Sequence, residues 1–92
     1  MVNIVIKKDG KEEPFNEEKI RNAIKAACLD AGLDENKQNE LSEIITQKIL
    51  GTLADKETIR AIELRDKILG ELDIMSPEAA QAWRNYEDSK SK

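Results

Sequence analysis

The densest group of charged side chains lies near the start of the chain, between positions 7 and 19. Lys7 and Lys8 follow a short apolar stretch, and Lys19 lies one turn into a helix that Asn16 is well suited to begin. The first turn of a helix presents free backbone N–H groups and about half a positive charge. Lysines beside such a turn would bind an anion such as a phosphate. The alternative is a solvated hairpin and helix start, and the residues alone leave both interpretations open.

The distribution of charge agrees with an anion site at this end of the chain. Residues 1–25 hold six basic and five acidic side chains, a net charge of +1, whereas the remaining residues sum to −5. The whole chain has 15 basic and 19 acidic side chains and a net charge of −4. This acidity argues against nucleic acid as the main partner, because nucleic acid favours a basic surface.

Residues for catalysis or metal binding are scarce. The chain has no histidine, and Cys28 is its single cysteine. Histidine-based acid/base chemistry, a zinc site and a disulfide framework are therefore disfavoured. No Gly-x-x-x-x-Gly-Lys-Ser/Thr run occurs, so there is no P-loop. The many carboxylates occur in helix turns that we expect to face solvent. We therefore predict that the chain is not an enzyme.

The apolar stretches are too short for a membrane protein. No run approaches the roughly 20 residues of a membrane span. Lys7 and Lys8 interrupt the first apolar stretch, which excludes the pattern of a signal peptide. We expect a cytoplasmic protein with neither a membrane nor a nucleic acid as partner.

A short hairpin over about residues 2–15 is predicted to position the lysines. Its first strand is rich in β-branched residues, and Asp9-Gly10 is a strong hairpin signal. We expect a type I′ turn there, with positive φ at both residues. Pro14 in the return strand has no amide hydrogen, so it must lie at a sheet edge or a strand end. A lone hairpin is marginal in water and must pack on other elements.

The rest of the chain is predicted to be helical. The expected helices cover about residues 16–31, 36–53, 61–72 and 76–88. Apolar residues at three- and four-residue spacing indicate their buried faces. Gly32 is placed to end the first helix, and Ser76 followed by Pro77 is placed to begin the last.

Two details of the helices bear on the core. The apolar stripe of the second helix includes Ile44, and that of the third includes Ile62. Residues 54–60 fit no single element, although Ile59 and Ile62 are spaced as if a helix began there. With 92 residues, the chain is long enough for one small domain. We predict a mainly α protein, a four-helix bundle capped by a short N-terminal β-hairpin or small sheet.

The N-terminal part resembles a known family. From Ile4 to Ile24 the sequence reads IVIKKDGKEEPFNEEKIRNAI. It is similar to the opening of an ATP-cone domain, whose pattern is Val-x-Lys-Arg/Lys-Asp-Gly, a glutamate, a hydrophobic residue, Asn or Asp, and then Lys-Ile and Ala-Ile. Glu63-Leu64-Arg65 followed by Ile68 resembles the family's third-helix signature, and residues 79–86 resemble its final helix. The resemblance covers nearly the whole chain.

The resemblance implies a fold and a function. ATP-cones are regulatory domains at the N-terminus of many ribonucleotide reductases, and they occur in the repressor of the reductase genes and in some archaeal kinases. Their fold is a small β-sheet over a four-helix bundle. The implied function is a non-catalytic module that binds ATP or dATP, with Mg²⁺ offsetting phosphate charge.

The implied partners follow from the same family. Nucleotide occupancy would control association of the module with itself, as a homo-oligomer, or with a nucleotide-metabolism enzyme such as a ribonucleotide reductase. No catalytic domain follows in these 92 residues, so we expect a free-standing module that acts in trans. The alternative is a small helical protein-interaction domain that keeps the scaffold without binding nucleotide.

The resemblance also implies which residues surround the base. Val5 and Ile20 match positions that form apolar walls for the adenine. Glu13 and Asn16 match polar positions that hydrogen-bond the base edge, although Asn16 is also suited to be only a helix cap. Tyr86 matches an aromatic residue near the base, and a core position is the alternative for it.

A second set of positions would face the phosphates. These are Lys7, Lys8, Lys19, Arg65 and Lys90. Arg60 is the alternative to Arg65, because the register of the third helix is open by several residues. Where many members of the family carry arginine after the final aromatic residue, this chain has Glu87. An acid at that point would repel a triphosphate.

Overall fold

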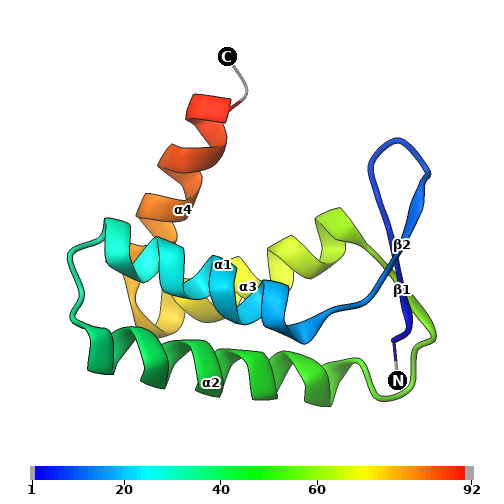
Figure 1. The fold of residues 1–92 in the computed structure, drawn as a ribbon, viewed down its shortest axis with the longest axis horizontal. Coiled ribbons are helices and arrows are strands. Elements are labelled where there is room, and N and C mark those ends of the chain that lie inside the picture. Colours follow the sequence, from blue (N-terminus) through cyan, green and yellow to red (C-terminus); the bar gives the residue numbers. More distant parts are fainter. Residues whose placement is uncertain (1, 91–92) are drawn as a thin grey trace.

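The computed structural model describes residues 2–90, which form three short strands and four helices (Figure 1). The elements are β1 (Ile4–Ile6), β2 (Glu12–Pro14), α1 (Glu17–Asp30), α2 (Glu35–Thr52), β3 (Thr58–Arg60), α3 (Ala61–Met75) and α4 (Pro77–Lys90). The predicted fold class, a helical bundle with a small N-terminal sheet, is confirmed. No helix in the described part of the chain is long and apolar enough to cross a membrane.

The sheet has a third strand in the segment that the sequence left unassigned. Its order is β2-β1-β3, with β1 antiparallel to β2 and parallel to β3. Val5 pairs with Glu13 on one side and with Ile59 on the other. Ile59 is therefore a buried strand residue and not the start of a helix. Pro14 lies at the end of an edge strand, as its missing amide hydrogen requires.

The hairpin turn differs from the predicted type I′. The backbone N–H of Gly10 donates to the carbonyl of Lys7 at 2.9 Å, and Gly10 has a φ of 87°. No non-glycine residue between positions 2 and 90 has a positive φ. The turn is therefore of type I with a left-handed glycine after it. The Asp9 carboxylate accepts a hydrogen bond from the Lys11 backbone N–H at 3.0 Å, which fastens the turn while Asp9 keeps an ordinary φ.

Side-chain and glycine caps set the helix ends. The Asn16 side chain accepts a hydrogen bond from the Glu18 N–H, and the Ser76 hydroxyl accepts one from the Ala79 N–H. Gly32, with a φ of 84°, ends α1 in a Schellman motif. Helix α3 runs to Met75, three residues beyond the predicted end at position 72. It ends there because Pro77 disfavours a helical conformation at the residue before it.

The core lies between the sheet and all four helices. Its buried apolar residues are Val2, Val5, Ile20, Ile24, Ala27, Cys28, Leu41, Ile45, Ile49, Leu53, Ile59, Ile68, Leu69, Leu72, Ala79 and Ala80. The Cys28 thiol is completely buried, and burial raises its pKa. The predicted stripes were wrong at Ile44 and Ile62, which are 37% and 55% exposed. The buried face of α2 instead turns toward Ser42 and Thr46.

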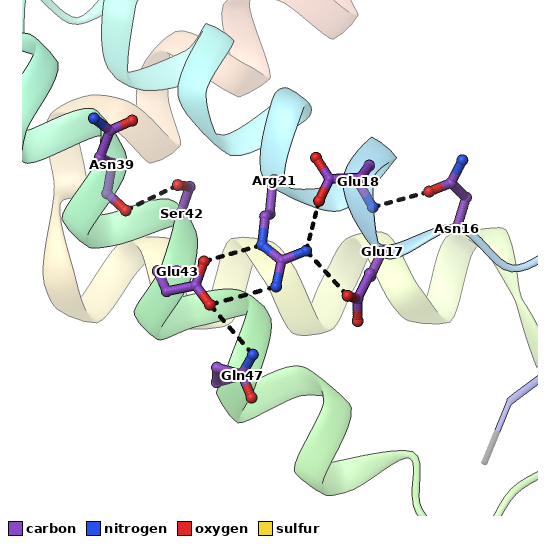
Figure 2. Close-up of polar contacts among 8 residues, drawn as sticks. All are labelled: Asn16, Glu17, Glu18, Arg21, Asn39, Ser42, Glu43 and Gln47. Atoms are coloured by element: carbon purple, nitrogen blue, oxygen red, sulfur yellow. Dashed lines mark hydrogen bonds and ion pairs between the residues drawn. The ribbon is translucent and has the colours of Figure 1, made fainter.

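An ion-pair network ties α1 to α2 across the surface (Figure 2). The Arg21 guanidinium lies 3.1 Å from Glu17 and 2.8 Å from Glu18 of its own helix. It also lies 3.0 Å from Glu43 of α2, which accepts a further hydrogen bond from Gln47. Hydrogen bonds from Arg21, and then from Gln47, hold the pKa of Glu43 below its usual range.

The packing of α2 generates a first prediction. Ile45 is completely buried, whereas Ile74 is 77% exposed. Ile45→Ala should lower the free energy of unfolding by about 2–5 kcal/mol, because it leaves a cavity in the core. Ile74→Ala, the same chemical change at the surface, should alter it by no more than about 0.5 kcal/mol. Urea denaturation of both variants measures the difference, and equal losses would contradict the buried register of α2.

The Glu43 contact generates a prediction about pH. A carboxylate with a lowered pKa in the folded state adds stability above its unfolded pKa, and that stability is lost as pH falls through the folded value. Glu43→Gln should therefore melt below the wild type at pH 7. The gap should begin to narrow as pH falls toward the ordinary pKa of a glutamate, about 4.3, and should close once pH is below the lowered pKa of the folded state. Thermal melts across pH measure it. Glu40→Gln, three residues earlier in α2, is the matched control and should lower the melting temperature less. A difference between Glu43→Gln and the wild type that persists in acid would contradict the role of Glu43.

Candidate functional site

A small pocket lies between the hairpin and helices α1, α3 and α4. We call it the hairpin pocket. Its lining is Val5, Glu13, Pro14, Phe15, Asn16, Lys19, Ile20, Ala23, Ala61, Leu64, Arg65, Ile68 and Trp83. Its volume is about 200 Å³. Sites for drug-sized ligands usually have about 300–1,000 Å³, so this pocket suits one ring system and not a whole nucleotide.

Two larger hollows adjoin the hairpin pocket. The lysine hollow, of about 450 Å³, is lined by Lys7, Lys8, Asp9 and Ala61. The helix cleft, of about 780 Å³, is lined by Ala23, Ala26, Ala27, Asp30, Ile62, Arg65, Trp83, Tyr86, Glu87 and Asp88. The hairpin pocket shares Ala61 with the first and Ala23, Arg65 and Trp83 with the second. In Figure 1 the hairpin and α4 rise from the same side of the bundle at opposite ends, with α1 and α3 between them.

The two residues predicted to form apolar walls are both in the hairpin pocket. Val5 is 6% exposed and Ile20 is 4% exposed, so each belongs to the core as well as to the pocket wall. Val5 is held there by its pairing on both sides within the sheet. Ile20 lies in the first turn of α1, on the helix face that turns inward. Both side chains therefore belong to the core and line the pocket, and their role as walls for a base stays a prediction.

Asn16 lines the same pocket and also caps α1. Its Oδ1 accepts the Glu18 N–H at 2.9 Å. That bond occupies the acceptor end of the side-chain amide. The amide nitrogen, with its two N–H groups, is the end that can serve a ligand. Asn16 can therefore keep its structural role while it donates a hydrogen bond into the pocket.

Two of the predicted phosphate-facing lysines converge on Glu13. The Lys7 Nζ lies 3.3 Å from Glu13 Oε2, and the Lys19 Nζ lies 3.9 Å from the same oxygen. One lysine comes from the end of β1 and the other from the first turn of α1, so the sheet closes over the helix start. Lys8 lies beside Lys7 at the turn and lines the lysine hollow. The cluster brings cations to the mouth of the hairpin pocket.

Arg65, and not Arg60, reaches the pocket. Arg60 ends β3 and lies just before α3, whereas Arg65 lies one turn into α3 and lines both the hairpin pocket and the helix cleft. The guanidinium is bound to Glu87 of α4, with Nε 2.7 Å from Oε2 and Nη2 2.5 Å from Oε1. Hydrogen bonds from Arg65, with a smaller contribution from Trp83, hold the pKa of Glu87 below its usual range.

One predicted residue lies outside the hairpin pocket, and several lining residues, Trp83 among them, were not predicted. Tyr86 is 56% exposed and lines the helix cleft, not the hairpin pocket. Lys90 ends α4, and its side chain is outside what the structure describes. Trp83 lines both the hairpin pocket and the helix cleft. Its partly buried ring packs against the core.

The residues fit Mg²⁺ only as a companion of phosphates. Within residues 2–90, no three side chains of the metal-ligating types gather into a site. Mg²⁺ is usually bound through substrate phosphates, waters and one or two carboxylates. Asp9 in the lysine hollow and Glu13 beside Lys7 are the carboxylates that would be available to it. The ion would reduce the repulsion between the phosphates and these two carboxylates.

A comparison with known families supplies the context for this geometry. A family model described as the ATP cone domain matches residues 3–91, nearly the whole chain. No curated protein matches the chain. The ATP cone is a nucleotide-binding regulatory domain and not a catalytic one. The match agrees with the observed architecture, a three-stranded sheet with four helices. The chain therefore belongs to the ATP-cone family.

Proposed function

We propose that this domain binds ATP or dATP with its base in the hairpin pocket and its phosphates over the lysines at the pocket mouth. The observation that carries the proposal is the meeting of Lys7 and Lys19 at Glu13, beside a pocket with buried walls. An aromatic base fits an apolar slot, and phosphates require the cations next to it. Occupancy of this site would regulate association of the domain with a second copy or with a partner such as a ribonucleotide reductase.

The polar residues of the pocket favour adenine over guanine. Both lysines lie against Oε2 of Glu13, so Oε1 is the oxygen that would accept a hydrogen bond from the base. Adenine offers an exocyclic N–H₂ donor, whereas guanine has an oxygen acceptor at the matching position. A carboxylate beside that oxygen would be repelled. The Asn16 amide nitrogen would donate to a ring nitrogen of adenine.

Typical interaction energies indicate how the binding energy would be divided between the ion pairs and burial of the base. Micromolar affinity needs about 8 kcal/mol, while an exposed ion pair contributes about 0–1 kcal/mol. Lys7 and Lys19 are 51% and 67% exposed, so their charges alone are too weak. Burial of the base against Val5 and Ile20 must supply most of the remainder. The lysines would then position the phosphates, and bound Mg²⁺ would offset their charge.

Ligand-dependent melting tests the proposal directly. ATP or dATP with Mg²⁺, at about 100 times its dissociation constant, should stabilise the domain by about 2.7 kcal/mol, a shift of several degrees. GTP should give a much smaller shift. If no nucleotide shifts the melting temperature at millimolar concentration, the domain is instead an interaction module that keeps this scaffold without the ligand.

A charge-matched pair of double variants locates the phosphates. Lys7→Ala with Lys19→Ala should weaken ATP binding by about tenfold or more, because it removes two charged contacts and leaves Glu13 unpaired beside the phosphates. Lys37→Ala with Lys48→Ala removes the same charge from α2, where each lysine also has one carboxylate partner. None of the three hollows includes a residue of α2. Calorimetric titration compares them, and equal losses of affinity would count against this site.

The single tryptophan reports on the base. Trp83 lines the hairpin pocket and is the only tryptophan in the chain. Adenosine and ATP should both change its fluorescence, because a base in the pocket would displace water from the indole. A melting shift with ATP that leaves the Trp83 emission unchanged would mean that the base binds elsewhere.

A further inference from the structure

We propose that Glu87 is an internal competitor of the nucleotide phosphates, because it occupies the guanidinium of Arg65 when no nucleotide is bound. This inference rests on the proposed function and adds a regulatory contact to the same site. The side chains of the pair come from α3 and α4, 22 positions apart in sequence. The contact lies at the boundary that the hairpin pocket shares with the helix cleft.

Arg65 and Glu87 form a two-pronged ion pair. Arg65 meets the Glu87 carboxylate through Nε and Nη2 with distances of 2.5 to 2.8 Å. This two-pronged arrangement is the one in which a guanidinium also binds a phosphate. The donors that Glu87 holds are therefore the donors that a phosphate would take. Arg65 cannot serve both anions in this manner at once.

The Arg65–Glu87 pair is accessible to a competing ligand. The side chains of Arg65 and Glu87 are 35% and 31% exposed, so solvent and a ligand reach both. Arg65 has a further contact with Asp66 at 3.0 Å, which remains when Glu87 is released. Glu87 keeps the neighbouring Trp83 and Arg84, both of which favour its charged form. Release of Glu87 therefore does not leave a carboxylate buried and alone.

Release of Glu87 from Arg65 would also change how α4 is held. The buried residues of this helix, Ala79 and Ala80, lie in its first turn, and Trp83 is the next residue that packs on the core. From Arg84 to Ser89, no residue in the described chain is buried. Contacts such as Arg65 with Glu87 therefore hold the second half of α4 against α3. When a phosphate takes Arg65, this half of α4 should loosen.

A removal of the competing charge tests the proposal. Glu87→Gln keeps the shape of the side chain and an acceptor for Trp83, but it holds Arg65 less strongly. The variant should bind ATP about three- to tenfold more tightly than the wild type, and adenosine equally well. Arg65→Gln should weaken ATP binding and abolish the gain when combined with Glu87→Gln. Calorimetric titration of the four proteins completes the cycle, with circular dichroism to verify that each is folded.

The second ion pair between α3 and α4 supplies a matched control. Arg84 meets Asp73 at 2.8 and 2.9 Å, also through two nitrogens, but neither residue lines the hairpin pocket. Asp73→Asn should loosen α4 without changing ATP affinity. Amide hydrogen exchange in the second half of α4 should rise on ATP binding in the wild type and should already be high in Glu87→Gln.

The outcomes separate the two proposals. A gain in ATP affinity for Glu87→Gln, with none for adenosine or for Asp73→Asn, supports the competition. Wild-type binding with no gain, or with a loss, in Glu87→Gln overturns the competition and leaves the proposed function standing. If neither the wild type nor Glu87→Gln binds any adenine nucleotide, both the competition and the proposed function are wrong.

Discussion

The candidate site depends on the three-residue strand β1 (Ile4–Ile6), which pairs with a neighbouring strand on each side. On one side β1 holds β2 and thereby brings Glu13 over the start of α1. On the other side it holds β3, which continues directly into α3 and its Arg65. A two-stranded hairpin alone is marginal in water, so the parallel partner is what keeps the hairpin closed over the bundle. The pocket beneath it exists because this central strand joins both ends of the site.

Three cations of the site already have an anionic partner. Glu13 lies between Lys7 and Lys19, and Glu87 holds Arg65. The exposed pairs of the two lysines with Glu13 cost little to exchange, because a surface ion pair contributes only about 0–1 kcal/mol. Without these internal acids the cations would repel each other in the empty pocket. A ligand would have to displace these acids from the cations. Only a ligand with several negative charges and good contacts to its base would do so.

Local chemistry explains which parts of this arrangement were predictable from sequence. Asn16, Gly32 and Ser76 act within one turn of a helix, and the helix ends that they set agree closely with the predicted ones. The strand Thr58–Arg60 carries no such signal, since its three residues become a strand only by pairing with β1 more than 50 positions away. Long-range pairing also explains why the sequence predicted only that Glu87 would repel a triphosphate, and not that it would pair with an arginine. Its partner lies on another helix, and the sequence does not reveal which arginine faces it.

The complete burial of Cys28 has a consequence for the chemical durability of the chain. A thiol reacts through its thiolate, and burial both raises the pKa of Cys28 and keeps oxidants from it. Oxidation or cross-linking between chains therefore has to wait until α1 separates from the core. Because Cys28 is the only cysteine, its rate of modification measures how often that separation occurs. A ligand that closes the hairpin onto α1 would then protect a sulfur atom that it never touches.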